Sequence, residues 1–353
     1  MAAITTKKPV YPISTSLRRF LVNHHREIEV PITYSDLFHY TSSINLEDKN
    51  GNDTYWETVF YSQADNEHIQ ACLKQVYAIM KADGDTSIME HLFIDRVDLC
   101  MYGNTKPFRV RIVNKMNDLF DYFYIKQADA SRIYGLELEH LLSPNKINYL
   151  VKGNTLLEEH IPGIPGDSFV NDYVISKKVN AGRLAKEFVK FNERCLVQLL
   201  GDIRGDNFVV EIIPDFDEVY YRMRAIDFDQ QSFDGRKSIY MPQFFKENYP
   251  IIDLGLKNMK PEVELQYQKE ERSRIANRIR NSELQLNALV KTMSQDSVST
   301  EENVDQLKYE LAELYKDSEF IACRNMGEIL NSSLRMIMKK PVRAVGKVDL
   351  SSQ

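Results

Sequence analysis

The sequence is poor in the residues on which covalent and metal-based scaffolds depend. Its four cysteines, Cys72, Cys100, Cys195 and Cys323, are far apart and form no CxxC pair, and its seven histidines include no HExxH motif. Scattered cysteines of this kind are typical of reduced, mostly buried thiols in a cytoplasmic protein. We therefore expect no disulfide framework and no zinc site, and nothing favours a metallohydrolase.

Long apolar runs and excess positive charge are also missing. No stretch of eighteen or more apolar residues occurs, and residues 1–9 have lysines without an apolar segment behind them, so we expect neither a membrane-spanning helix nor a secretion signal. Lys and Arg number 45 against 51 Asp and Glu, a net charge of −6. This balance argues against sequence-independent nucleic-acid binding, which depends on basic surfaces.

What the sequence does contain is an ordinary globular composition, with 43% hydrophobic and 27% charged residues in 353 positions. A chain of this length exceeds one simple core, so two lobes or one enlarged domain are expected. Residues 1–88 read as a mixed α/β extension, with a strand near 55–61 and an amphipathic helix at 69–80, and carry no recognisable chemistry.

Residues 89–162 have the pattern of a small lobe built on an antiparallel sheet. The expected elements are strands at 91–101, 108–112 and 121–126, a helix at 131–142, and strands at 147–151 and 155–160. A turn is expected at Gly103-Asn104, and the Pro-Gly-rich segment 161–166 predicts a hinge. The first three strands should form a meander.

Residues 163–340 predict a larger, mostly helical lobe, and residues 341–353 a tail. A helix is expected at 184–195, followed by strands at 207–213 and 218–226 that are joined by an enlarged turn at 214–218. The segment 261–340 is helical and carries charges of both signs, as solvated helix surfaces do. The fold class expected is therefore α+β.

One group of polar residues points to chemistry. The segment Gly-Asp-Ile-Arg-Gly-Asp-Asn at 201–207 places Asp202 and Asn207 between a helix and a strand, and Ile-Asp-Phe-Asp at 226–229 follows the next strand. Phosphoryl transfer from ATP requires a carboxylate to orient the acceptor hydroxyl and hard oxygen ligands to hold Mg²⁺ against the phosphates. Turn-forming Asp and Asn residues without a ligand are the alternative interpretation.

These motifs resemble the protein-kinase-like fold, in particular its small-molecule branch of aminoglycoside phosphotransferase and choline kinase relatives. That branch carries H-G-D-x-x-x-x-N and then a hydrophobic-D-[FW]-[DEG] segment. The resemblance implies that Asp202 is the catalytic base, that Asn207 and Asp227 are metal ligands, and that Asp229 reaches a second metal. It covers about residues 90–235.

The resemblance extends upstream in the expected order. Lys126 ends a strand where kinases place the lysine that binds the α- and β-phosphates, and its ion-pair partner would lie on the next helix. Glu137 is the first choice because it lies one turn from Tyr134 and Leu141 on the expected packed stripe, and Glu139 is the competitor.

The residues after the last strand of the smaller lobe, Glu159, His160 and Ile161, would bind adenine through their backbone. The nucleotide would then lie between the two lobes. Arg204 has two interpretations, a phosphate contact or an ion pair with Asp206, and the pair is favoured.

Three departures from the family pattern bear on function. Leu200 replaces the expected histidine, residues 102–105 (Tyr-Gly-Asn-Thr) replace a GxGxxG loop, and 20 positions separate Asn207 from Asp227, a longer gap than a simple hairpin requires. No A-P-E segment follows Asp229, which argues against a protein substrate.

The sequence therefore predicts an ATP- and Mg²⁺-dependent kinase-like phosphotransferase acting on a hydroxyl of a small-molecule acceptor. The alternative is a catalytically degenerate kinase-like module that binds nucleotide, or serves as a scaffold through its helices at 261–340. Neither the acceptor nor the oligomeric state has a sequence signal, and no nucleic-acid or membrane partner is expected.

Overall fold

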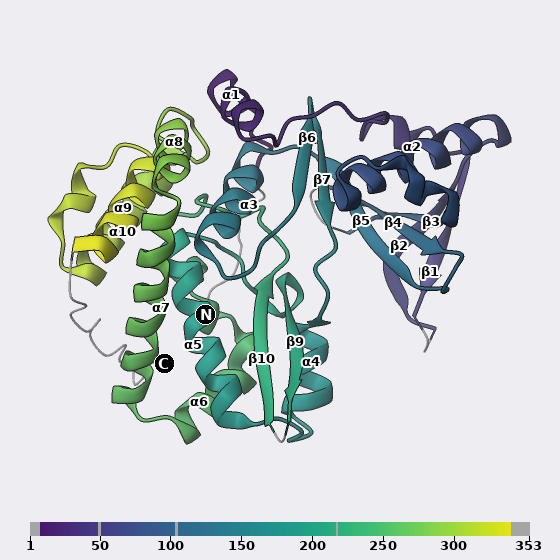
Figure 1. The fold of residues 1–353 in the computed structure, drawn as a ribbon. Helices are drawn as coiled ribbons and strands as arrows, with labels where there is room; N and C mark the ends of the chain where they lie inside the picture. The colour runs from purple at the N-terminus through teal and green to yellow at the C-terminus, as the bar shows by residue number, and fades with distance from the viewer. Residues whose placement is uncertain (1–7, 49–50, 103–104, 217, 340–353) are drawn as a thin grey trace. The chain divides into compact units, whose positions relative to one another are not determined.

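The computed structural model describes residues 8–48, 51–102, 105–216 and 218–339 (Figure 1). The turn expected at Gly103-Asn104 and the tail at 341–353 lie outside these residues. Contacts between Cα atoms divide the chain into two units: unit 1 comprises residues 1–11, 130–146 and 161–353, and unit 2 comprises residues 12–129 and 147–160. The domain boundaries expected at 88/89 and 162/163 remain predictions, and this division falls at other positions.

Unit 2 is built on a seven-stranded antiparallel sheet with the order β1-β2-β3-β4-β5-β7-β6. Its strands are β1 (Ser42–Glu47), β2 (Asp53–Phe60), β3 (Leu92–Cys100), β4 (Phe108–Asn114), β5 (Phe120–Gln127), β6 (Tyr149–Lys152) and β7 (Thr155–Glu159). Its helices are α1 (Thr15–Asn23), α2 (Gln63–Ala82) and the short 3-10 helices η1 (Asp36–Phe38) and η2 (Thr86–His91). The predicted meander is confirmed as β3-β4-β5, and β7 pairs with β5.

The sheet and α2 share one hydrophobic core. Ser62 caps α2 by accepting a hydrogen bond from the N–H of Asp65, and Asp83 ends the helix in the left-handed conformation. The buried face of α2 includes Leu73 and Val76, which belong to the same cluster as Phe108 of β4. The N-terminal extension expected from sequence thus contributes β1 and β2 to the sheet, and α2 packs on the core of the same unit.

Unit 1 is mostly helical and surrounds α5 (Ala181–Gln198), which contacts α3, α6, α7, α10 and β10. Its other helices are α3 (Ala130–Leu142), α4 (Gly166–Phe169), the π-helix η3 (Val170–Val174), α6 (Tyr249–Asn258), α7 (Pro261–Asn281), α8 (Glu283–Met293), α9 (Glu301–Tyr315) and α10 (Met326–Lys339). Short 3-10 helices are η4 (Gly205–Asn207), η5 (Lys237–Tyr240), η6 (Pro242–Phe244), η7 (Lys246–Asn248) and η8 (Ser318–Ala322). The helix expected at 184–195 is confirmed, and the segment expected to be helical from 261 consists of four α-helices and η8 up to residue 339.

A three-stranded sheet in unit 1 contains the two strands that lie between the polar segments singled out by the sequence, 201–207 and 226–229. It has the order β10-β9-β8, with β8 (Ile164–Pro165), β9 (Phe208–Asp215) and β10 (Glu218–Ala225). The enlarged turn expected at 214–218 is wrong, because Pro214 pairs with Val219 and Asp215 with Glu218. Two eight-residue strands, rather than a long turn, account for the distance in sequence between Asn207 and Asp227.

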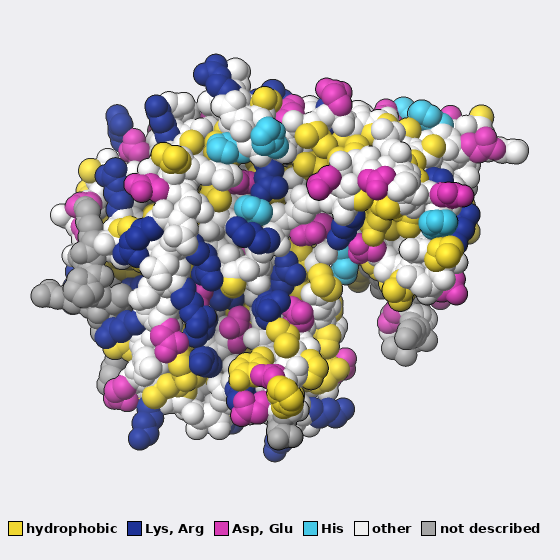
Figure 2. Space-filling view, viewed as in Figure 1, with side chains coloured by type: hydrophobic (Ala, Val, Ile, Leu, Met, Phe, Trp, Pro, Cys, Tyr) yellow, Lys and Arg dark blue, Asp and Glu magenta, His cyan; other side chains and the backbone are white. Residues whose placement is uncertain are grey.

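The outer face of α7 and its neighbours shows Lys and Arg side chains interspersed with Asp and Glu, as expected of a solvated helix surface (Figure 2). Beneath it lies an ion-pair network. Arg194 of α5, 4% exposed in its side chain, bonds Glu187 at 3.0 Å and Glu271 of α7 at 3.2 Å. In the described part of the chain, no helix combines the length and apolarity needed to cross a bilayer.

We expect Arg194→Met to destabilise the protein by about 3–5 kcal/mol, since the change leaves the carboxylate of Glu271 buried beside an apolar side chain. The measurement is the midpoint of urea unfolding. Lys257→Met is the matched control, because Lys257 pairs with Asp253 on an exposed helix surface. Equal midpoints for the two variants would show that the network does not stabilise the unit.

Candidate functional site

The loop between α5 and β9 holds Asp202 in a specific orientation. Helix α5 ends at Leu199 in the left-handed conformation (φ 55°), and Asp202 is also left-handed (φ 57°), which aspartate tolerates better than most residues. The backbone oxygen of Asp202 accepts hydrogen bonds from Asn207 Nδ2 at 2.6 Å and from the N–H of Arg204 at 3.0 Å. The loop therefore closes on itself around Asp202.

The segment after β10 packs directly against this loop. A Cβ at Gly201 would lie 2.9 Å from the backbone oxygen of Gln230, so glycine permits the close approach. Leu200, where the resemblance leads one to expect histidine, forms an antiparallel bridge with Gln231 and is 2% exposed. Gln231 Nε2 also donates to the backbone oxygen of Gln198 at 2.6 Å. This bridge and this side-chain hydrogen bond brace the loop without a histidine.

Asp202 is the most perturbed carboxylate of the loop. Burial raises its pKa to about 7; the neighbouring Asp227 raises it further, whereas Arg204 and the hydrogen bond from Asn207 act in the opposite direction. Its Oδ1 is buried and accepts no hydrogen bond from the described residues, although Arg204 Nε lies 3.3 Å away. A buried carboxylate oxygen of this kind is suited to receive a hydroxyl proton.

Asp227 and Asp229 follow β10 and share one cationic partner. Arg132, from the first turn of α3, donates from Nη2 to Asp227 Oδ1 at 2.5 Å and from Nε to Asp229 Oδ1 at 2.7 Å. The Arg132 side chain is 3% exposed, against 32% for Asp227. The two carboxylates that the resemblance assigns to metal are therefore held by a guanidinium.

The donor types nevertheless fit Mg²⁺. Asn207 supplies an amide oxygen, and Asp227 and Asp229 supply carboxylate oxygens. Within the described residues, no group of three or more His, Cys, Asp and Glu side chains could hold a metal ion by itself. Mg²⁺ commonly takes one or two carboxylates and completes its shell with water and substrate phosphates, so these residues suit a metal that arrives with phosphate.

Lys126 lies in unit 2 and has a carboxylate partner that sequence analysis did not consider. Its Nζ bonds Glu158 Oε2 at 2.6 Å, and both side chains are less than a tenth exposed. Lys126 pairs with Leu156 and Glu158 with Tyr124, so the two charged residues are diagonal neighbours on β5 and β7. The ion pair follows from strand register, which sequence spacing alone does not reveal.

Glu137 and Glu139, the expected partners of Lys126, belong to unit 1, so their pairing with Lys126 remains a prediction. Glu137 is fully buried and accepts a hydrogen bond from Gln285 Nε2 at 2.6 Å. Burial raises the pKa of Glu139. The single packed stripe that favoured Glu137 is not observed, because α3 is buried on nearly all sides.

Backbone groups in the stretch expected to bind adenine, residues 159–161, already form hydrogen bonds with other parts of the chain. The N–H of Glu159 donates to the backbone oxygen of Asn148 at 3.1 Å, and the N–H of His160 to that of Tyr122 at 3.3 Å. Burial lowers the pKa of His160. Two of the three backbone N–H groups between Glu159 and Ile161 are therefore already bonded.

The ion pair expected for Arg204 is confirmed. Its Nη2 lies 3.3 Å from Asp206 Oδ2, and Nε lies 3.3 Å from Asp202 Oδ1. Arg204 thus contacts both carboxylates of the loop and supplies the positive charge nearest to Asp202.

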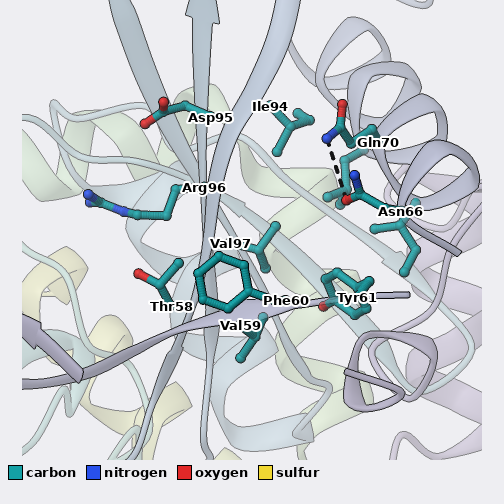
Figure 3. Close-up of a pocket in the computed structure, with 12 residues that line it drawn as sticks. Thr58, Val59, Phe60, Tyr61, Asn66, Gln70, Ile94, Asp95, Arg96 and Val97 are labelled. Atoms are coloured by element: carbon teal, nitrogen blue, oxygen red, sulfur yellow. Dashed lines mark hydrogen bonds between the residues drawn. The ribbon is translucent and has the colours of Figure 1, made fainter. Parts of the chain in front are cut away.

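A cavity of about 220 Å³ lies in unit 2, where β2 and β3 diverge beyond their pairing at Thr58 and Asp98 and α2 covers the gap (Figure 3). Its lining residues are Thr58, Val59, Phe60, Tyr61, Asn66, Ile69, Gln70, Leu73, Ile94, Asp95, Arg96 and Val97. On α2, Gln70 Nε2 donates to Asn66 Oδ1 at 3.4 Å beside the cavity (Figure 3). None of the residues singled out by the sequence lines this cavity.

No protein-family model matches this chain, and a search of curated proteins gives no match either.

Two partners of the predicted site residues, one in each unit, were missed by sequence reasoning. Arg132 carries a signal in retrospect, as the one charged residue in the helical turn Ala-Ser-Arg-Ile-Tyr at 130–134. Glu158 carries none, because Glu158 and Glu159 are adjacent and only the strand register shows which of them lies on the side of Lys126.

We expect Asp202→Asn to alter how stability depends on pH. Because the pKa of Asp202 is about 7 in the folded protein, the folded state retains a proton that the unfolded chain loses near pH 4. Wild-type stability should thus fall with rising pH through this window, by up to about 1.4 kcal/mol per pH unit, and level off above pH 7.

The stability of Asp202→Asn should lack this pH-dependent contribution. The free energy of unfolding of Asp202→Asn minus that of wild type should therefore increase from pH 4 to pH 7. Urea unfolding at each pH measures it, with the exposed Asp215→Asn as control. A constant difference between Asp202→Asn and wild type at all pH values would contradict the raised pKa.

Proposed function

We propose that this protein is an ATP- and Mg²⁺-dependent phosphotransferase with a two-lobed protein-kinase-like fold of the small-molecule branch. It would transfer the γ-phosphate to a hydroxyl group of a small acceptor. The α+β architecture is compatible with this proposal. The order of elements supports it as well, with a three-strand meander, a helix, two further strands, and then the Asp202 loop before a hairpin.

The observation that carries the proposal is the state of Asp202. Its carboxylate is 13% exposed, has a buried oxygen without a hydrogen bond, and has a pKa of about 7. A carboxylate tuned in this way is near the optimum for a general base at neutral pH. Asn207 orients it through Nδ2, which lies 3.3 Å from Asp202 Oδ2.

The residues would divide the work as follows. Asp202 would accept the proton of the acceptor hydroxyl and align its oxygen, while Asn207 and Asp227 would hold Mg²⁺, with Asp229 beside them. Bound Mg²⁺ supplies the charge neutralisation that phosphoryl transfer requires. Lys126, held by Glu158, would bind the α- and β-phosphates. The glycines at 201 and 205 allow the close packing that keeps the loop in place.

A catalytically degenerate nucleotide-binding or scaffold module is the second candidate. The observation that favours it is Arg132, which bonds both Asp227 and Asp229 and so competes with the metal role of these carboxylates. The polar surface of the helices at 261–340 would then be the interaction surface.

We expect Asp202→Ala to reduce turnover about 100-fold or more and to leave nucleotide affinity largely unchanged, because a base acts in the transition state. Slow ATP hydrolysis without added acceptor, measured as ADP release, is the assay. Arg222→Gln, a single-charge change on β10 outside the loop, is the control. Full activity in Asp202→Ala would remove Asp202 from the reaction.

We expect the melting temperature of the wild type to rise with ATP and Mg²⁺ together, since a ligand that binds only the folded state stabilises it in proportion to the logarithm of its concentration. Asp227→Ala should lose the Mg²⁺-dependent part of this shift. A shift without ADP release supports the degenerate module, and no shift with any nucleotide contradicts nucleotide binding altogether.

A further inference from the structure

The interaction between Arg132 and the two carboxylates after β10 is built into the interior of unit 1. Arg132 projects from the first turn of α3, and its side chain is 3% exposed. Its guanidinium donates one hydrogen bond to each carboxylate: Nε donates to Asp229 Oδ1 at 2.7 Å, and Nη2 donates to Asp227 Oδ1 at 2.5 Å. Because arginine remains protonated in proteins, this positive charge is permanent.

The backbone holds the two acceptors in place. Asp227 Oδ1 also accepts a hydrogen bond from the N–H of Asp229 at 3.2 Å, so one oxygen receives both a guanidinium and a backbone donor. Arg132 thus places one guanidinium against two carboxyl groups. A free divalent cation that approached these oxygens would meet a buried positive charge already bonded to them.

We propose that Arg132 is an internal counter-cation that competes with divalent metal for Asp227 and Asp229, so that the site accepts the metal together with a polyphosphate and not as the free ion. A nucleoside triphosphate brings the negative charge that Arg132 has cancelled. The identity of this second ligand and the metal role of Asp227 and Asp229 both rest on the proposed function, and separate titrations test them below.

Arg132 is thus a positioning residue that also determines whether metal binds alone or only together with a polyphosphate. It aligns Asp227 and Asp229 before any ligand arrives and prevents their occupation by metal alone. A purely structural arginine would contribute only to folding stability, and its replacement would leave the metal affinity of the folded protein unchanged.

The test is a titration of the nucleotide-free protein with Mn²⁺, followed by electron paramagnetic resonance of the unbound ion. We expect Arg132→Gln to bind free Mn²⁺ at least tenfold more tightly than wild type. Arg222→Gln, which removes the same charge from an exposed pair on β10, should match wild type. Equal Mn²⁺ affinity in wild type and in folded Arg132→Gln would overturn the proposal.

Arg132→Lys provides a second variant that keeps the charge but loses the forked geometry, and it covers the case in which Arg132→Gln fails to fold. If Arg132→Gln folds, the affinity of Arg132→Lys for free Mn²⁺ should lie between those of wild type and Arg132→Gln. If Arg132→Gln does not fold, the affinity of Arg132→Lys should still exceed that of wild type. An affinity no higher than that of wild type would contradict competition at these carboxylates.

A second titration with a non-hydrolysable ATP analogue present separates the two proposals. Tighter Mn²⁺ binding in Arg132→Gln without any effect of the analogue on either protein would support the competition and contradict the phosphotransferase. Binding of the analogue with Mn²⁺ to wild type, without any gain of free Mn²⁺ binding in Arg132→Gln, would support nucleotide binding and overturn the role of Arg132.

Discussion

The interior of unit 1 depends on one constraint, that a charge removed from water must meet an opposite charge. Arg194 meets Glu187 and Glu271, Arg272 meets Glu193, and Arg132 meets Asp227 and Asp229. Except for Arg194 and Glu187, which both lie on α5, these pairs join segments far apart in sequence. Loss of one partner would be costly where the other is buried, as for Glu271 and Glu193, because an unpaired charge would then stay buried. The helices of this unit are therefore held in register by ionic contacts as well as by apolar packing.

Asp202 is largely buried but lacks a cationic partner of its own. Its nearest cation, Arg204, is shared with Asp206, and its Oδ1 accepts no hydrogen bond from the described residues. The consequence is a carboxylate whose pKa rises to about 7. A buried group left under-compensated inside a well-braced loop is a common property of reactive sites, and for this reason we place the proposed chemistry there.

Local pattern predicted much of the architecture. The meander β3-β4-β5, the helix α3 and the hairpin β9-β10 follow from period-2 and period-3.6 spacing, which depends on neighbours in sequence. The same reasoning was wrong about the turn at 214–218, because Pro214 remains compatible with an edge position of the hairpin. The sequence pattern also predicted one packed stripe on α3, whereas nearly all of α3 is buried. Periodicity alone does not show how many elements surround a helix.

By itself, the sequence determined the meander, the helix α3 and the helix α5, and that Asp202, Asn207 and Asp227 lie at the ends of such elements, because these properties depend on residues a few positions apart. Only the tertiary structure decided which charges meet. Arg132 and Asp227 are 95 positions apart, and Lys126 and Glu158 are 32 apart. Their pairing depends on strand register, helix packing and loss of solvent, which exist only once distant segments have come together.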